Sequence, residues 1–169
     1  ILKPQVKEFR ALPESEQLVM SMADKAKIVT VPHALVKSKD SYAYITKRID
    51  RVFSKDSNVK LIAMEDFCQL DLRLTQDKYK GSYERCGNII KKYSYRPGLD
   101  MTELFYRLVF SFIVGNSDMH LKNFSLIETQ SGSGAYHFSP AYDLLPVNVI
   151  MPEDKEEFAL PINGKKNNI

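Results

Sequence analysis

The chain has 169 residues, of which 44% are hydrophobic and 27% are charged, which is ordinary for a globular fold of one or two compact units. The formal net charge is +3, from 24 basic and 21 acidic residues, so bulk charge gives no case for direct nucleic-acid binding. No apolar run approaches the roughly 20 residues that cross a bilayer, so no membrane association is expected.

An amphipathic helix is predicted to begin near Glu16, because apolar residues recur after it at helical spacing. The stripe expected to face the core is Leu18, Met22 and Ala26, with Val19. An acid at the start of a helix also suits the helix dipole, so Glu16 has a plain structural role as an alternative to a functional one.

A β-hairpin is predicted next. Residues 34–36 and 42–46 are rich in β formers, and residues 38–40 between them have the composition of a turn. Beyond the hairpin, Asp50 lies among basic residues. Without a functional role, it would be an ordinary surface charge. The polar stretch at 54–58 predicts a mobile loop.

The rest of the chain is predicted to be mainly helical. One helix is expected at 82–93, and another is marked by an apolar face consisting of Leu104, Phe105, Leu108, Val109, Phe112 and Ile113. Asp100, three residues before Glu103, offers a capping-box-like start for the second helix, and Gly115 offers a stop.

Together these elements predict an α+β fold in two parts. Residues 1–50 form a small part with one helix among short strands, and residues 51–169 form a mainly helical part with an embedded β-hairpin. Cys68 and Cys86 lack the spacing of a zinc site and sit in apolar surroundings, so free buried thiols in a reducing compartment are expected.

The most informative polar residues follow the second helix. Asp118 is followed by Asn123, then by two β-prone runs at 124–127 and 136–138, and then by Asp143. A hairpin returns the chain to where it left, so Asn123 and Asp143 should lie at the same end of the ribbon. Asp143 as a simple turn or cap residue is the alternative.

This set of residue types fits phosphoryl transfer. The reaction needs one carboxylate to orient the attacking hydroxyl, which Asp118 can supply, and oxygen ligands for magnesium, which Asn123 and Asp143 can supply. Lys122 is expected either to face the phosphates or to be a solvated loop lysine. The pattern therefore favours the core of a kinase.

Several segments resemble the HipA-type toxin kinases, which are bacterial serine/threonine kinases. Residues 116–125 and 139–143 look like the catalytic and metal-binding segments of that family. Residues 1–4 resemble the family's strand that carries the phosphate-contacting lysine, and residues 12–16 resemble the opening of the next helix. Residues 45–51 resemble the adenine-binding hinge. Two further family segments resemble residues 65–69 and 78–83.

The resemblance implies a two-lobe, protein-kinase-like fold that uses ATP and Mg²⁺ as cofactors. It implies that Lys3 contacts the α- and β-phosphates and pairs with Glu16, for which Glu14 is the alternative. It also implies that backbone groups of Lys47 and Ile49 bond the adenine edge.

For the remaining site residues, the resemblance implies that Asp50 lies near the ribose and that Asp118 is the catalytic base. His120 would support the loop or the nucleotide, and Lys122 belongs to the same catalytic motif. Asn123 and Asp143 would be the metal ligands.

The resemblance also implies partners. These are a protein acceptor, with an aminoacyl-tRNA synthetase as one candidate, and a DNA-binding antitoxin protein; a cytoplasmic location is expected. The family has a glycine-rich phosphate loop before the lysine strand and further helices at its end, whereas here no glycine precedes Gly81 and the chain stops soon after 162–166. We therefore expect either a fragment of a longer protein or a chain that is completed by separate partner segments.

Two other functions remain open from the sequence. A small-molecule kinase of the aminoglycoside or choline type uses a similar acid and amide at the same spacing. A non-catalytic, kinase-like binding module is the second alternative.

Overall fold

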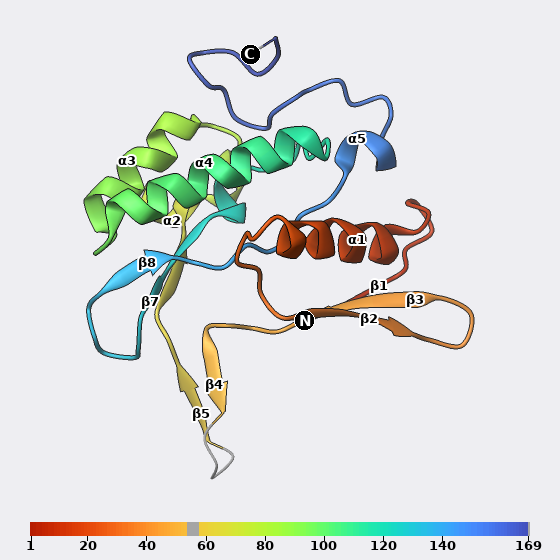
Figure 1. The fold of residues 1–169 in the computed structure, drawn as a ribbon, viewed down its shortest axis with the longest axis horizontal. Helices are drawn as coiled ribbons and strands as arrows, with labels where there is room; N and C mark the ends of the chain where they lie inside the picture. The colour runs from red at the N-terminus through yellow and green to blue at the C-terminus, as the bar shows by residue number, and fades with distance from the viewer. Residues whose placement is uncertain (54–57, 169) are drawn as a thin grey trace.

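The computed structural model describes residues 1–53 and 58–168, so most of the loop expected at 54–58 lies outside the described residues. The described chain is a mixed α+β fold, as predicted (Figure 1). Its strands are β1 (Leu2–Pro4), β2 (His33–Lys37), β3 (Tyr42–Thr46), β4 (Arg51–Phe53), β5 (Val59–Leu61), β6 (Met64–Asp66), β7 (Ser125–Glu128) and β8 (Tyr136–Phe138). Its helices are α1 (Leu12–Lys25), α2 (Phe67–Leu70), α3 (Tyr83–Tyr93), α4 (Pro97–Ile113) and α5 (Val147–Ile150), with short 3-10 helices at Thr75–Asp77 and Leu121–Asn123.

The first sheet has the strand order β1-β3-β2, with both pairs antiparallel. The predicted hairpin is confirmed as β2 and β3, in which Leu35 lies opposite Tyr44. Helix α1 packs along this sheet, as Figure 1 shows. On the other side of β3, Lys3 of β1 also lies opposite Tyr44, so the central strand fixes the position of the lysine.

The predicted core stripe of α1 is confirmed at Val19 and wrong at Leu18, Met22 and Ala26. Leu18 is 60% exposed and Met22 is 43% exposed. The residues that α1 buries are Pro13, Glu16, Val19, Met20 and Ala23. Apolar side chains occur all around this helix, so spacing alone did not select the face that packs on the sheet. Glu16 therefore lies on the buried face, where a solvated first-turn charge is excluded.

The second half of the chain contains a sheet with the order β6-β7-β8. The predicted second hairpin is confirmed as β7 and β8, with Ile127 opposite His137. Strand β6 adds to the other edge of β7, so Met64 also lies opposite Ile127. All four residues of β7 are buried, which makes this strand part of the core. The antiparallel pair β4 and β5 was not predicted.

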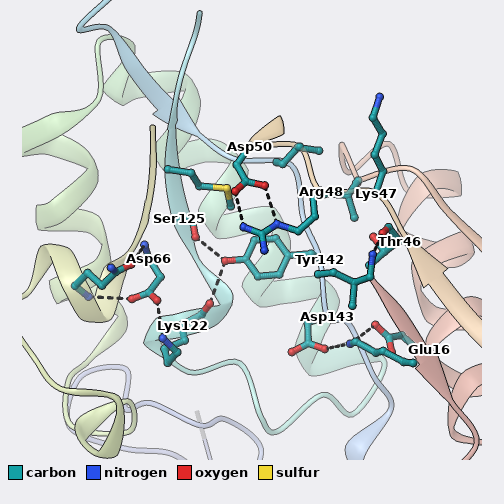
Figure 2. Close-up of a pocket in the computed structure, with 16 residues that line it drawn as sticks. Glu16, Thr46, Lys47, Arg48, Asp50, Asp66, Lys122, Ser125, Tyr142 and Asp143 are labelled. Carbon is teal, nitrogen blue, oxygen red and sulfur yellow. Dashed lines mark hydrogen bonds and ion pairs between the residues drawn. The ribbon is translucent and has the colours of Figure 1, made fainter. Parts of the chain in front are cut away.

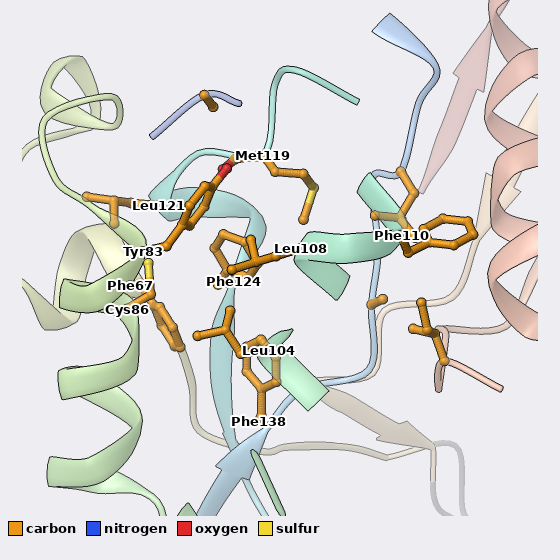
Figure 3. Packing of buried hydrophobic residues seen from close by; sticks show 14 of the residues in the cluster. Phe67, Tyr83, Cys86, Leu104, Leu108, Phe110, Met119, Leu121, Phe124 and Phe138 are labelled. Atoms are coloured by element: carbon orange, nitrogen blue, oxygen red, sulfur yellow. The ribbon is translucent and has the colours of Figure 1, made fainter. Parts of the chain in front are cut away.

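Three phenylalanines form the centre of the core (Figure 3). The ring centroids of Phe67 and Phe124 are 5.8 Å apart, those of Phe67 and Phe138 are 5.7 Å apart, and those of Phe124 and Phe138 are 6.1 Å apart. These rings come from α2, from the residue before β7 and from the end of β8. Aromatic contacts of this kind are directional, so the hairpin is held firmly against the helices.

The predicted start of α4 is wrong. The helix begins at Pro97, and Asp100 lies within its first turn rather than ahead of it. The Asp100 carboxylate is buried and accepts hydrogen bonds from Ser94 Oγ at 2.6 Å, Arg96 Nε at 3.0 Å and the Phe138 backbone N–H at 2.8 Å. This acid therefore ties α4 to β8 instead of forming a capping box at the start of α4.

Only part of the predicted apolar face of α4 is buried. Leu104 and Leu108 face the core, whereas Phe105 is 63% exposed and Ile113 is 71% exposed. The helix predicted at 82–93 is confirmed as α3, which packs against α4. Within residues 1–53 and 58–168, neither α4 nor another helix has the length and apolarity to cross a membrane. Both cysteines are free and buried, as predicted.

The chain returns from the second half to the first sheet through residues 139–143. The Val31 N–H donates to the Ala141 carbonyl at 2.9 Å, and the Ala141 N–H donates to the Val29 carbonyl at 2.7 Å. Two residues after this parallel pairing, Asp143 reaches Lys3 of β1. The division of the chain into domains at residue 50 stays a prediction.

Replacing Asp100 with alanine is expected to destabilise the fold by about 3 kcal/mol, because three buried or half-buried donors lose their acceptor. Urea unfolding of wild type and Asp100→Ala measures this loss. Asp40→Ala, at an exposed turn acid, is the matched control and should change the unfolding free energy by less than about 0.5 kcal/mol. Equal stability of Asp100→Ala and wild type would contradict the assigned role.

Candidate functional site

A cavity of about 520 Å³ opens beside the first sheet, the segment at 47–50 and the segment at 142–143 (Figure 2). Its lining includes an apolar group, which consists of Val31, Ile49 and Met64, and a charged group, which consists of Lys3, Glu16 and Asp143. Such a combination suits a ligand that has a flat apolar ring and an anionic end.

Lys3 lies between two carboxylates. Its Nζ is 2.8 Å from Glu16 Oε1 and 2.5 Å from Asp143 Oδ1. Glu16 is 2% exposed, whereas the side chains of Lys3 and Asp143 are about two fifths open to solvent at 37% and 41%. The Lys3 ammonium also lies 5.7 Å from the centroid of the Tyr44 ring. The lysine is therefore held from four directions by β1, β3, α1 and the 142–143 segment.

These charges change the protonation of one another. Burial raises the pKa of Glu16 to about 7, against the opposing effect of the Lys3 charge. Burial lowers the pKa of Lys3, but the carboxylates of Asp143 and Glu16 outweigh it, so the net pKa of Lys3 is raised. Lys3 thus stays charged at neutral pH with Asp143 as its nearer partner, while Glu16 titrates close to neutrality.

Asn123 and Asp143 are in contact at the same end of the β7–β8 hairpin. The Asn123 amide Nδ2 donates to Asp143 Oδ2 at 3.1 Å, and Asn123 Oδ1 accepts from the His120 backbone N–H at 3.2 Å. Asp143 has a φ of 59°, in the left-handed region that aspartate tolerates better than most residues. The contact confirms the proximity that the hairpin pattern predicts, and the roles of both residues as ligands stay predictions.

The segment at 47–50 lines the cavity with Lys47, Ile49 and Asp50. The Lys47 N–H is used by the Pro32 carbonyl at 2.9 Å, so only its carbonyl can serve a ligand. Within the described part of the chain, the backbone N–H and carbonyl of Ile49 have no hydrogen-bond partner. The role of Lys47 in binding adenine stays a prediction, and its carbonyl is the group left for it, because the N–H is bonded to the residue before β2.

Asp50 forms a two-point ion pair with Arg48. Arg48 Nε lies 2.8 Å from Asp50 Oδ1, and Arg48 Nη2 lies 2.5 Å from Asp50 Oδ2. The hydrogen bonds from Arg48 hold the pKa of Asp50 below its ordinary value, so this carboxylate is charged at neutral pH. Both residues line the cavity, so a ligand that bonds Asp50 must share it with Arg48.

The predicted catalytic residues Asp118 and His120 lie on the loop before β7 and do not line the described cavity. The half-buried Asp118 accepts a hydrogen bond through Oδ1 from the Tyr79 hydroxyl at 2.6 Å. His120 is buried, and burial lowers its pKa, so it is neutral at physiological pH. A neutral His120 suits a supporting role in the loop.

Lys122 does line the cavity, where its Nζ is 2.7 Å from Asp66 Oδ2. Neither of the expectations for Lys122 included this pair. Asp66 also caps α2 by accepting the Gln69 backbone N–H, and Gln69 Oε1 accepts the Asp66 backbone N–H in return. The spacing of an acid and a glutamine three residues apart is a capping-box signal that could have marked Asp66.

Tyr142 is a second residue that the sequence argument passed over. Its hydroxyl donates to the Lys122 carbonyl at 3.0 Å and shares a hydrogen bond of 2.6 Å with Ser125 Oγ. This hydrogen bond joins Tyr142, the residue before Asp143, to Lys122, the residue before Asn123. It therefore fixes the separation of the two side chains that are predicted to bind metal. Only its position next to Asp143 hinted at this role.

No cluster of three or more His, Cys, Asp or Glu side chains suited to a metal occurs in the described ranges 1–53 and 58–168. The predicted magnesium site instead combines one carboxylate with one amide, which is enough when phosphate oxygens and water complete the shell.

Comparison with known proteins adds to this geometry. The sequence pattern of the family described as "HipA-like C-terminal domain" matches residues 1–169. Two proteins of Sinorhizobium fredii, named "Putative kinase Y4mE" and "Putative kinase Y4dM", are 31% identical over 98% of this chain and 30% identical over 86% of it. This chain covers 39% and 36% of those proteins, so it spans about two fifths of their length.

Solved structures share the fold. A chain from the Shewanella oneidensis MR-1 toxin–antitoxin complex of HipA, HipB and operator DNA has a TM-score of 0.87, with 20% identity, over 99% of this chain and 42% of that chain. The Helicobacter pylori proinflammatory kinase CtkA has a TM-score of 0.64, with 16% identity, over 85% of this chain and 48% of its own. At these identities the likeness establishes the fold alone.

Replacing Glu16 with glutamine is expected to remove a pH dependence of stability. Because the folded pKa of about 7 lies above the ordinary value of 4.5, this group contributes stability in full below pH 4.5, and the contribution is lost as pH rises through 7. The unfolding free energy of wild type should fall by on the order of 3 kcal/mol over this window from Glu16 alone.

Urea unfolding at acidic and slightly alkaline pH measures the effect. Glu16→Gln should lack the decrease, and Glu14→Gln, two residues away on the same helix, should keep it. The assignment fails if Glu16→Gln and wild type lose the same stability over this pH range.

Proposed function

Because this chain belongs to the HipA-like C-terminal domain family, we propose that it forms the nucleotide-binding core of a two-lobe serine/threonine protein kinase. The reaction is transfer of the γ-phosphoryl group of ATP to a protein hydroxyl. The observation that carries the proposal is the meeting of Lys3 and Asn123 at the two oxygens of Asp143, across a sequence separation of 140 residues for the lysine.

The donor types around Asp143 fit Mg²⁺. The Asp143 carboxylate lines the cavity and is 41% exposed to solvent, and it is a hard oxygen ligand. The Asn123 carboxamide oxygen, which accepts the His120 backbone N–H, is a second one. Asn123 and Asp143 would hold the ion, which would neutralise charge on the phosphate oxygens. Lys3 supplies a further positive charge to the α- and β-phosphates, and Glu16 keeps its ammonium directed into the cavity.

The other end of the cavity suits the nucleoside. The free backbone groups of Ile49 and the carbonyl of Lys47 offer both a donor and acceptors to an adenine edge, and Val31 and Met64 supply apolar walls. Asp50 is charged and can accept bonds from ribose hydroxyls while Arg48 holds it in place. This division between apolar and charged lining supports ATP over a purely anionic ligand.

Asp118 is proposed as the residue that accepts the proton of the attacking hydroxyl. It is half-buried and lies outside the cavity lining, as expected of a group that acts on the acceptor rather than on the nucleotide. His120 supports the loop, since its backbone N–H donates to Asn123 Oδ1. Lys122 borders the cavity through its pair with Asp66 and is proposed to face the phosphates when nucleotide is bound.

The proposed biological role is that of the toxin of a bacterial toxin–antitoxin pair. The similar Shewanella chain belongs to an assembly of HipA with HipB and operator DNA, which supports a DNA-binding antitoxin protein as a partner here. A protein acceptor such as an aminoacyl-tRNA synthetase and a cytoplasmic location are part of this proposal. The small net charge of +3 supports indirect rather than direct contact with DNA.

Labelled ATP offered with three acceptor classes tests the function. The expected result is transfer from [γ-³²P]ATP to serine or threonine of protein, and none to kanamycin or choline. Labelling of a small alcohol alone would favour the small-molecule kinase. Binding of ATP without transfer to any acceptor would favour a non-catalytic module and overturn the proposal.

Asp143→Ala is expected to abolish the magnesium-dependent part of ATP affinity. Removing the carboxylate deletes a metal ligand and also frees Lys3, so affinity in EDTA should stay the same or rise slightly, while affinity with Mg²⁺ should fall by about tenfold or more. Isothermal titration with Mg²⁺ and with EDTA measures both. Asp24→Ala on α1 is the control, and an unchanged effect of Mg²⁺ in Asp143→Ala contradicts the metal role.

Asp118→Ala is expected to lower kcat by about 10²–10⁴-fold, because proton transfer from the acceptor loses its base. ATP affinity should stay within severalfold of wild type, since Asp118 is not placed against the nucleotide. Steady-state phosphorylation and ATP titration separate the two effects. Undiminished turnover would remove Asp118 from the proposed mechanism.

A further inference from the structure

The Tyr79 hydroxyl makes a direct hydrogen bond to the proposed base. It donates to Asp118 Oδ1 at 2.6 Å, from a position 39 residues earlier in the chain. Within the described residues, Asp118 Oδ2 has no hydrogen-bond or ion-pair partner. One carboxylate oxygen is therefore held and the other is free to meet an acceptor. A bond this short to a charged oxygen belongs to the stronger class of hydrogen bonds.

The tyrosine ring also contacts the same loop. Its centroid lies 5.1 Å from that of the His120 ring, at an interplanar angle of 76°, which is an edge-on packing. The Lys78 ammonium lies 4.9 Å from the Tyr79 ring centroid. The ring can thus hold its place without the hydroxyl, which separates packing from hydrogen bonding in a Tyr79→Phe variant.

The segment that carries Tyr79 is docked on the loop at two further points. The Leu121 N–H donates to the Lys78 carbonyl at 3.2 Å. Gly81 approaches the Leu121 side chain so closely that a Cβ there would lie 3.3 Å from its Cδ1. The segment itself follows a 3-10 helix and is closed by the bond from the Lys80 N–H to the Asp77 carbonyl at 2.8 Å. These contacts fix the backbone of the segment that carries Tyr79 relative to the loop that carries Asp118.

We propose that Tyr79 is a positioning residue for phosphoryl transfer, whose hydroxyl orients the Asp118 carboxylate so that Oδ2 faces the acceptor hydroxyl. The inference rests on the proposed function. Burial, the Asp118 hydrogen bond and the Asp118 charge raise the pKa of Tyr79, so the phenol remains a donor at all physiological pH values. Tyr79 is 45% exposed, so its ring lies partly at the surface beside Asp118.

Tyr79→Phe is the primary test, with Tyr83→Phe as a matched control. The Tyr83 hydroxyl donates to the Met119 carbonyl at 2.9 Å, so it supports the same loop without touching Asp118. In phosphorylation assays with [γ-³²P]ATP, Tyr79→Phe should lower kcat about tenfold and leave KM for ATP within about twofold. Tyr83→Phe should lower thermal stability and change kcat less than about twofold.

A double-mutant cycle distinguishes orientation of Asp118 from general support of the fold. In an Asp118→Asn background, Tyr79→Phe should cause no further loss of residual transfer, because the oriented group is already gone. Full additivity of the two losses overturns the proposal. So does unchanged or increased kcat of Tyr79→Phe, which would mean that the hydroxyl blocks the acceptor position.

Failure of the proposed function is recognisable separately. If wild type labels no acceptor, the kinase assignment fails first, and if Asp118→Asn retains full activity, the role of Asp118 as the base fails first. Amide hydrogen exchange of residues 117–121 then tests whether the Tyr79–Asp118 hydrogen bond holds the loop. Exchange should be faster by about tenfold in Tyr79→Phe than in wild type. Equal exchange in the two proteins overturns the positioning role of Tyr79.

Discussion

The backbone pairing of residues 29–31 with Ala141 is the constraint on which the candidate site depends. It brings a segment near the end of the chain against the residues that precede β2, and two residues later Asp143 contacts Lys3. The cavity borders this junction, so its lining combines groups that lie far apart in the sequence, such as Lys3 and Asp143.

The charges of the site are not paired one to one, because Lys3 is the partner of two carboxylates, those of Glu16 and Asp143. Glu16 is buried on the sheet-facing side of α1, where an acid without a partner would be costly. Lys3 offsets this cost but also serves Asp143, so one cation balances two acids. An incoming polyphosphate and its metal ion would redistribute this pairing, which ties ligand binding to the packing of α1.

The loop that carries Asp118 is rigid for a different reason. It lies between the aromatic core formed by Phe67, Phe124 and Phe138 and the docked segment at 78–81. The Tyr142 hydroxyl clamps Lys122 from the other side. Close packing of this kind leaves few alternative arrangements of the loop, so the proposed catalytic geometry would be largely formed before a nucleotide binds.

Sequence patterns were sufficient to predict both confirmed hairpins, helix α3 and the residue types of the candidate site. Both hairpins followed from β-prone runs and turn residues, and a hairpin must bring its two ends together, so the contact of Asn123 with Asp143 was predictable. Only the tertiary structure decided which faces are buried and which distant groups meet. Spacing could not distinguish Leu18 from Val19 as the core residue of α1, nor could it pair Tyr79 with Asp118. Periodicity records neighbours within one element, whereas these contacts depend on how separate elements pack.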